Sequence, residues 1–190
     1  MTEFLPPSLN FDIRGLVQAI QHSQAGDALK CHFSPLDWEI FARHMQPLSI
    51  NAGQVIIERG AMDRTIYFVE NGMLSVHYED ESSRIRMAMV GAGTVLGEGA
   101  FFSHQPRSAT VHASSACKLW CLTAQRFSEL AMRHSPIALE LSLAIGAVMA
   151  KRHYNQARRV SVAYALAAIV LRAYIPRRLG ARKQPRAVLP

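Results

Sequence analysis

The middle of the chain alternates short β-rich runs with turn-forming residues and has no helical pattern between the runs. Six runs of four to seven residues carry side chains typical of strands, and glycines such as Gly53, Gly60 and Gly91 separate them. The predicted strands are Gln54–Ile57, Thr65–Glu70, Met73–Tyr78, Arg84–Val90, Ser108–Ala113 and Lys118–Leu122. Strands spaced this closely, without helical crossovers, pair antiparallel. The sequence therefore predicts a mainly β domain with helices, a barrel or a sandwich, and the Asn71-Gly72 pair predicts a hairpin within it.

Two short amphipathic helices are predicted on either side of the strands. The first runs from about Leu36 to Met45, with Ser34 as a possible cap and Pro35 at the first helical position. The second covers Gln125 to Arg133. The first pattern sets Leu36, Ile40 and Phe41 on one face, as an amphipathic helix requires.

A long helix is predicted from Pro136 onward, followed by a further helical segment over Val160–Tyr174. An apolar stripe repeats along it at spacings of three and four, formed by Ile137, Leu141, Ala144 and Val148. A stripe this narrow is typical of a two-stranded coiled coil and predicts a homodimer, although a helix packed on its own barrel has the same pattern.

Positive charge is concentrated at the end of the chain. Residues 141–190 contain ten Lys or Arg and no acid, whereas residues 1–140 hold eleven bases against fourteen acids. Such a tail suits nucleic acid, an acidic partner or a membrane surface, or it is simply a solvated face. The uncharged stretch Val160–Leu171 is too short to span a bilayer, so no membrane segment is expected.

The most informative segment lies between the fourth and fifth predicted strands. One acid, Glu98, and one arginine, Arg107, stand nine residues apart among Gly, Ala and Ser. Small residues let backbone approach a ligand, and the first turn of a helix offers free N–H groups to an anion. An arginine fork suits phosphate oxygens, and a carboxylate accepts from a sugar hydroxyl. The segment therefore predicts a site for a sugar phosphate of low charge.

This segment resembles the phosphate-binding cassette of cyclic-nucleotide-binding domains in the catabolite-activator (Crp/Fnr) family. There, Gly-Glu opens a short helix, as at Gly97-Glu98, and Pro-Arg-Ser/Ala-Ala starts the next strand, as from Pro106 to Ala109. The stretches at Gly53–Ile56, Gly60 and Asn71-Gly72 resemble the family's early strands, and the similarity covers roughly Leu36 to Asn155. The resemblance implies a β-roll (jelly-roll) barrel followed by a long C-terminal helix, and a regulatory protein that binds cAMP or cGMP.

The resemblance also implies a role for each residue of the cassette, which we define as residues 97–109. Arg107 would pair with the cyclic phosphate, Glu98 would accept from the ribose 2′-hydroxyl, and backbone amides with the Ser108 hydroxyl would complete the cradle. Gly99 departs from the pattern, because the family usually carries an aliphatic residue there. The implied ligand-binding residues are Gly97, Glu98, Gly99, Ala100, Arg107, Ser108 and Ala109, with Tyr154 and Asn155 as weaker candidates for contact with the base.

Four parts of the chain are expected on this basis. They are an N-terminal segment (1–35), the β-roll (36–135), a dimerisation helix (136–159), and a helix with a basic tail (160–190) in place of a complete winged helix-turn-helix domain. Two alternatives to a cyclic-nucleotide sensor stay open, since relatives with a similar cassette sense other signals. One is a transcription regulator truncated before its DNA-binding domain, and the other is a dimeric scaffold without a ligand. Whichever of these holds, DNA binding is expected to be weak at most and to come from the basic tail.

Enzymatic and metal functions find no support in the motifs. The eight histidines show no HExxH or comparable ligand spacing, and no serine elbow, Walker loop or GxGxxG stands in a suitable context. The N-terminus has no signal-peptide pattern and the three cysteines form no CxxC pair. The sequence therefore predicts a cytoplasmic regulator without a catalytic residue or a metal.

Overall fold

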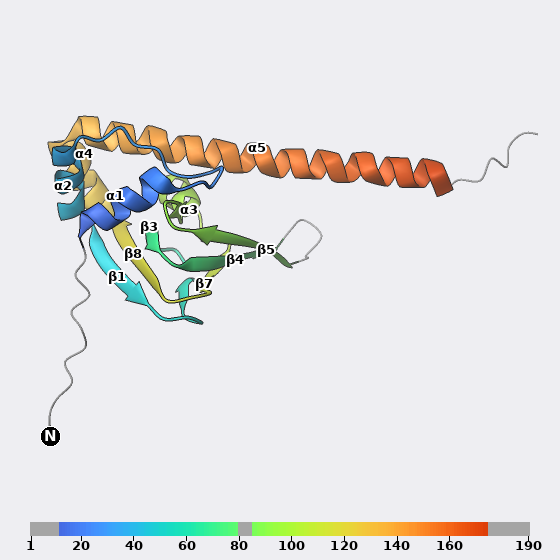
Figure 1. Cartoon of the computed structure of the whole chain (residues 1–190), viewed down its shortest axis with the longest axis horizontal. Helices are drawn as coiled ribbons and strands as arrows, with labels where there is room; N and C mark the ends of the chain where they lie inside the picture. The colour runs from blue at the N-terminus through green and yellow to red at the C-terminus, as the bar shows by residue number, and fades with distance from the viewer. Residues whose placement is uncertain (1–11, 80–84, 175–190) are drawn as a thin grey trace, which may run out of the picture. The chain divides into compact units, whose positions relative to one another are not determined.

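The structure is a computed structural model that describes the backbone of residues 12–79 and 85–174, and the side chains of residues 12–78 and 87–157. It divides into two compact units, residues 1–151 and 152–190. The first unit contains two four-stranded antiparallel sheets and five helices, the last of which continues into the second unit (Figure 1). The expectation of a mainly β fold followed by a long C-terminal helix is confirmed.

The first sheet has the strand order β1-β8-β3-β6. Its strands are β1 (Gln46–Ile50), β8 (Cys117–Thr123), β3 (Thr65–Asn71) and β6 (Val95–Leu96). Sequence patterns identify β3 and β8 but miss β1, which contains Pro47, and β6, which has only two residues. Proline weakens a strand pattern because it cannot donate to the ladder, and two residues are too few to show an alternation.

The second sheet has the order β2-β7-β4-β5. Its strands are β2 (Val55–Ile57), β7 (Thr110–Ala113), β4 (Met73–Glu79) and β5 (Ile85–Gly91). All four agree with the predicted runs to within two residues. Leu74, Val76 and Val111 point toward the first sheet, where they pack with Val69 and Leu119 in one hydrophobic core.

The Asn71-Gly72 pair does not form the predicted hairpin. It connects β3 of the first sheet to β4 of the second, and these two strands do not pair with each other. Gly72 has φ +99°, and a Cβ there would lie 2.6 Å from the carbonyl oxygen of Ala116. The pair supplies a tight turn with positive φ, and the same chemistry serves a crossing between sheets as well as a hairpin.

Helices cover the outer side of the first sheet. They are α1 (Ile13–His22), α2 (Pro35–Arg43), α3 (Glu98–Ser103) and α4 (Ala124–Arg133). α2 begins as predicted, with Pro35 in its first turn and a capping box between Ser34 and Asp37. α1 was not expected from the sequence, although Asp12 caps it and Leu16 and Ile20 are buried.

α5 (Ser135–Tyr174) is one continuous helix, where the sequence predicts a separate segment from Val160. The apolar stripe from which the sequence predicts a homodimer is not a free surface. Ile137, Leu141, Ala144 and Val148 are all buried in a core shared with the other helices and the first sheet. The alternative interpretation of the stripe, a helix packed on its own barrel, therefore holds for these four residues.

Candidate functional site

The cassette begins at Gly97, where any larger residue would force the neighbouring atoms to move. Gly97 follows β6, caps α3, and has φ +81°. A Cβ at this position would lie 2.7 Å from the carbonyl oxygen of Thr65 and would collide with the guanidinium of Arg107. The close approach brings the backbone at the start of α3 directly against the arginine.

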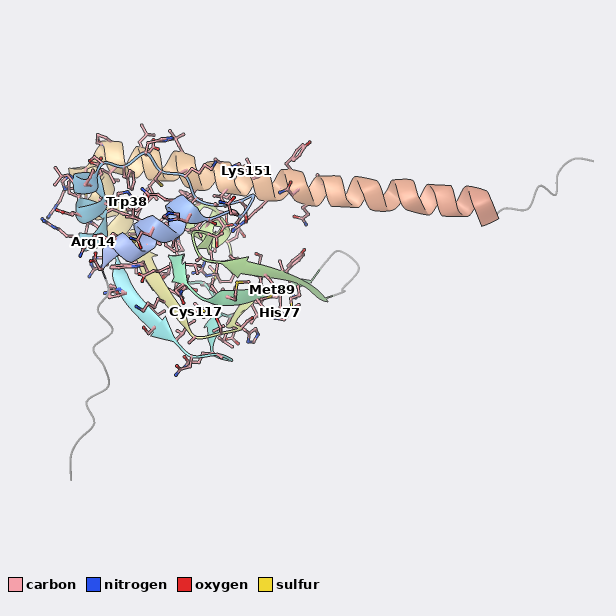
Figure 2. All side chains as sticks on the ribbon, in the orientation of Figure 1. Arg14, Trp38, His77, Met89, Cys117 and Lys151 are labelled. Carbon is pink, nitrogen blue, oxygen red and sulfur yellow. The ribbon has the colours of Figure 1, made fainter. Side chains whose placement is uncertain are left out.

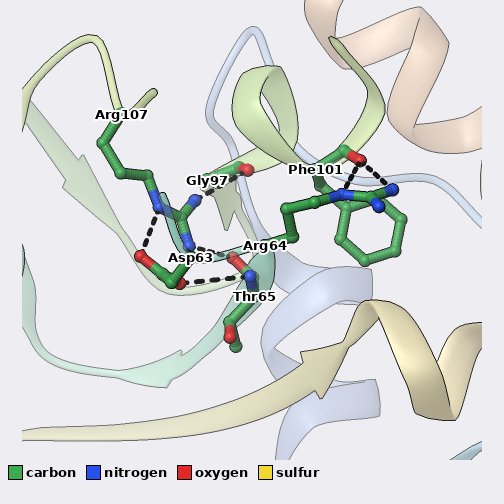
Figure 3. A network of polar contacts seen from close by, with 6 residues as sticks. All are labelled: Asp63, Arg64, Thr65, Gly97, Phe101 and Arg107. Atoms are coloured by element: carbon green, nitrogen blue, oxygen red, sulfur yellow. Dashed lines mark hydrogen bonds and ion pairs between the residues drawn. The ribbon is translucent and has the colours of Figure 1, made fainter. Parts of the chain in front are cut away.

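Arg107 is buried, with 3 % of its surface exposed, and its guanidinium is held by three residues (Figure 3). Nε donates to Asp63 Oδ2 at 2.8 Å and Nη2 donates to Asp63 Oδ1. Nη2 also donates to the carbonyl oxygen of Thr65 at 2.7 Å, and Nη1 donates to that of Gly97 at 2.9 Å. These bonds to described residues use four of the five N–H groups of a guanidinium and leave one on Nη1.

Asp63 provides the counter-charge that lets Arg107 be buried. Hydrogen bonds from Arg107, followed by the attraction of its charge, hold the pKa of Asp63 below the ordinary range of a carboxyl, against the opposing effect of partial burial. The side chain of Asp63 remains 46 % exposed, whereas that of Arg107 is 2 % exposed. The pair therefore has one face toward solvent, on the side of the carboxylate.

The loop before β3 is bonded to the cassette backbone as well. The amide of Arg107 donates to the carbonyl oxygen of Ala61 at 2.9 Å, and the amide of Gly60 donates to that of Arg107 at 2.9 Å. The Arg59 amide donates to Thr110 Oγ1 at 3.2 Å. The strand-like pairing fixes the backbone from which the Arg107 side chain extends.

Arg64 secures the other end of α3 (Figure 3). Its Nε and Nη2 donate to the carbonyl oxygen of Phe101 at 3.1 and 2.9 Å, and its guanidinium lies 5.9 Å from the centre of the Phe101 ring. The Phe101 ring in turn contacts Phe127 of α4 edge to face, at 5.3 Å between centroids. The amide of Ala124, the first residue of α4, donates to the carbonyl oxygen of Arg64 at 3.1 Å. α3 is therefore joined to α4 through two separate contacts.

The predicted ligand residues occupy different environments. Gly97 and Arg107 are in direct contact, and Ala100 is a buried residue of α3. Glu98 and Ala109 are half-buried, whereas Gly99 and Ser108 are exposed. Tyr154 and Asn155 are exposed residues of the second unit, and contact between them and a base stays a prediction.

Sequence reasoning missed Asp63, Arg64 and Thr65, the three consecutive residues that hold both ends of α3. A buried arginine requires a carboxylate partner, so an acid near Arg107 could be expected in principle. Nothing local, however, distinguishes Asp63 from the other thirteen acids of the chain, because it lies 44 residues before Arg107.

Two features are absent from the part of the chain that the structure describes. Nowhere in residues 12–79 and 85–174 do three His, Cys, Asp or Glu side chains gather as a metal site of those ligands would require. No helix in the described part of the chain is long and apolar enough to cross a membrane.

Comparison with known proteins agrees with the cassette. The family model described as "Cyclic nucleotide-binding domain" matches residues 47–134. The cAMP-dependent protein kinase type II regulatory subunit of Drosophila melanogaster is 32 % identical over 83 residues, which are 43 % of this chain and 22 % of that protein. The chain spans about a fifth of the length of this protein and of two other cAMP-dependent protein kinase regulatory subunits that it matches.

Solved structures give the same fold. A cyclic nucleotide-binding domain from Methylobacillus flagellatus superposes with a TM-score of 0.69 at 17 % identity, covering 78 % of this chain and 82 % of that one. The c-di-GMP-responsive global regulator CLP of Xanthomonas campestris gives a TM-score of 0.59 at 24 % identity, over 67 % and 63 % of the two chains. Residues 47–134 therefore match the cyclic nucleotide-binding domain family, and the fold is that of its Crp/Fnr-type regulators.

Proposed function

We propose that this domain is a regulatory module that binds a cyclic nucleotide, with cAMP as the first candidate ligand, and has no catalytic residue of its own. The observation that carries the proposal is the buried guanidinium of Arg107 in contact with Gly97, the residue that begins α3. A fixed cation beside the backbone amides at a helix start suits the single negative charge of a cyclic phosphodiester. The name of the Drosophila relative, a cAMP-dependent regulatory subunit, supports cAMP among the possible nucleotides.

The hydrogen-bond pattern suggests how the phosphate would approach. Nε and both N–H groups of Nη2 already have partners, so the remaining N–H group of Nη1 is the donor left for a ligand. Nη1 lies beside Gly97, next to the backbone amides of the first turn of α3. A phosphate at this point would accept from Nη1 and from these amides without displacing Asp63.

The carboxylate of Asp63 gives the site a preference for low ligand charge. Arg107 and Asp63 together carry no net charge, so a monoanion brings the group to −1 and a dianion to −2. Repulsion between Asp63 and a second phosphate charge disfavours a phosphomonoester. The site would therefore bind a 3′,5′-cyclic phosphate in preference to the corresponding 5′-monophosphate.

The sugar and base contacts follow from the family resemblance. Glu98, the first residue of α3, would accept from the ribose 2′-hydroxyl, and the Ser108 hydroxyl would donate to the phosphate. Ala100 and Ala109 would let the backbone approach the ligand. Tyr154 and Asn155 remain the candidates for contact with the base.

A signalling route through the helices fits the contacts of α3. Ligand binding would shift the first turn of α3, and Phe101 would transmit the change to Phe127 of α4, which directly precedes α5. A ligand shifts such an equilibrium only through contacts that differ between the two states. The amides of α3 and Nη1 of Arg107 would provide these contacts.

We also propose a homodimer, formed through an exposed face of α5. This face differs from the apolar stripe that the sequence indicates, which is buried. Leu139 and Leu143, one helical turn apart, are 62 % and 63 % exposed, and Gly146, Ala147 and Ala150 continue the same face. Two copies packed through this face would bury leucines that the fold of one chain leaves in solvent.

Titration calorimetry of the full chain with cAMP, cGMP and c-di-GMP tests the proposal. Heat is expected with cAMP at a stoichiometry of one per chain. Arg107→Leu should weaken binding by 2 to 5 kcal/mol, roughly 30-fold to several thousand-fold. Because Arg107 also anchors Asp63, Thr65 and Gly97, this variant will lose stability, so Arg107→Lys is measured in parallel and the exposed Arg133→Leu is the control.

Absence of heat and of any thermal shift at millimolar cyclic nucleotide would show that the pocket assignment is wrong. A chain that dimerises but binds none of the three nucleotides is the ligand-free scaffold. Binding of c-di-GMP alone would indicate a sensor with the effector named for the Xanthomonas regulator.

A further inference from the structure

The outer face of the second sheet carries a group of methionines and histidines that the nucleotide site does not use. On β4, Leu74 and Val76 point into the core, so Met73, Ser75 and His77 point outward. His112 of β7 and Met89 of β5 share this outer face, because they lie opposite Ser75 in the two neighbouring strands. Figure 2 labels His77 and Met89 on their strands.

Ser75 is the centre of a ring of four side chains. Its cross-strand partners are Met89 on one side and His112 on the other, and Met73 and His77 are its neighbours of the same face along β4. Ser75 is only 7 % exposed although it lies on the outer face, whereas Met73 and Met89 are 42 % and 49 % exposed. The ring therefore covers the serine and remains open to solvent itself.

The two imidazoles converge over this centre. Nε2 of His77 lies 3.0 Å from Ser75 Oγ, so its ring folds back toward the serine. The rings of His77 and His112 stand nearly perpendicular, at 85°, with their centroids 5.1 Å apart. The separation is short enough for one nitrogen of each ring to reach a common ion at a bond length of about 2 Å.

The two methionines flank the same serine, Met73 along β4 and Met89 on the neighbouring strand. Directly paired residues have their Cβ atoms about 5 Å apart, so Met89 borders Ser75 closely. The Met73 sulfur lies 3.0 Å from where a Cβ of Gly91 would be, on the strand that carries Met89. Three rotatable bonds allow each methionine to bring its sulfur inward.

We propose that this ring, formed by Met73, His77, Met89 and His112, binds a soft monovalent metal ion, Cu(I). Thioether sulfur selects Cu(I) among the common metals, and imidazole suits it equally. All four ligands are neutral and the ring contains no carboxylate, so a hard dication such as Mg²⁺ finds no suitable donor. Zn²⁺ is disfavoured because it prefers thiolate, imidazole and carboxylate to a thioether.

The sequence alone predicts no metal because these ligands are far apart in the chain. His77 and His112 come from different strands, and only the register of β4 with β7 brings them together. Two of the four ligands are methionines, so the set also differs from the His, Cys, Asp and Glu clusters that the described residues lack. The site is independent of the cassette and does not require nucleotide binding.

An anaerobic titration with Cu(I), in competition with the coloured chelator bicinchoninate, measures affinity and stoichiometry. The full chain is used with Cys31, Cys117 and Cys121 replaced by alanine, because thiols compete for Cu(I). One bound ion per chain is expected. Met89→Leu and His112→Gln should each weaken binding at least about tenfold, and Met132→Leu, at a methionine 78 % exposed elsewhere, should not.

Methyl NMR of the same cysteine-free chain with Ag(I), a redox-inert analogue, provides a second measurement that reads the methionines directly and shows from the same spectra that the chain is folded. The methyl signals of Met73 and Met89 should shift up to one equivalent, while those of Met62 and Met132, both highly exposed, stay in place. Equal shifts at all four methionines, or ion binding unaffected by Met89→Leu and His112→Gln, would overturn the proposal.

Discussion

Asp63 accepts two hydrogen bonds from the guanidinium of Arg107, which lies 44 residues later in the sequence, and the bond from Nε is 2.8 Å long. Among the described residues, Asp63 is the only one that forms an ion pair with Arg107. The pair has two consequences. It stabilises the folded chain by neutralising a buried cation, and it sets the charge that an incoming phosphate meets. Both can be measured with one substitution.

Asp63→Asn should lower the free energy of unfolding by about 1 to 2 kcal/mol, because the buried cation loses its counter-charge. The figure is below that of a fully buried pair because nearly half of the Asp63 side chain is in solvent. The same change should raise affinity for 5′-AMP more than for cAMP, since it removes repulsion of the second phosphate charge. Urea unfolding and calorimetry check both, with the exposed Glu39→Gln as control.

The stability difference between wild type and Asp63→Asn should also depend on pH. The pKa of Asp63 is lowered in the folded chain by its bonds to Arg107, so its contribution is complete above the ordinary carboxyl value of about 3.9. It is lost as the pH falls through the lower, folded value. Unfolding curves should show a constant difference from pH 7 to about 5 and convergence below about 4; a constant difference down to pH 2 contradicts the assignment.

The cassette contains a matched pair of glycines with opposite expectations. Gly97→Ala places a methyl group against Thr65 and Arg107 at positive φ, and should cost about 1 to 3 kcal/mol and abolish nucleotide binding. Gly99→Ala meets no atom within 4 Å and replaces a helical glycine. It should stabilise α3 by about 0.5 to 1 kcal/mol and tighten binding roughly two- to fivefold. Calorimetry distinguishes the two, and equal effects would exclude a role for α3 rigidity.

Much of the fold follows from local chemistry. Ser34 and Pro35 mark the start of α2, and the six predicted runs all become strands, because caps and alternating side chains act within a few residues. The Gly97-Glu98 pair and Arg107 can be recognised in the same way, because they lie within one short segment of the sequence.

What the sequence does not reveal depends on contacts between distant segments. The choice of Asp63 as partner for Arg107 depends on the path of the loop bonded at Gly60 and Ala61. A helix stripe such as that of Leu141 looks the same whether it packs on the chain's own sheet or on a second copy. Asn71-Gly72 likewise has the same turn chemistry in a hairpin and in a crossing between sheets.

Weak, sequence-independent DNA binding is expected from the basic end of the chain. Its bases are Arg158, Arg159, Arg172, Arg177, Arg178, Arg182, Lys183 and Arg186, of which the last five lie outside the described residues. Each phosphate neutralised releases counterions, so affinity should fall steeply with salt. Gel shifts on specific and scrambled duplexes across a salt series check this. Tight binding to one sequence at physiological salt would contradict it.

The last prediction concerns the exposed face of α5. Leu143 is 63 % exposed, and a charge there leaves the core of one chain intact, because Leu141 and Ile145 supply the buried contacts. Leu143→Glu should therefore convert a dimer to a monomer without lowering the stability of the monomer. Met132→Glu, at a residue 78 % exposed on α4, is the matched control and should remain dimeric. Sedimentation equilibrium measures the two side by side with wild type. A wild-type chain that is monomeric at high concentration would rule out a dimer on this face. Dimerisation unchanged by Leu143→Glu would rule it out as well, because burying two glutamates between paired helices carries a large desolvation cost.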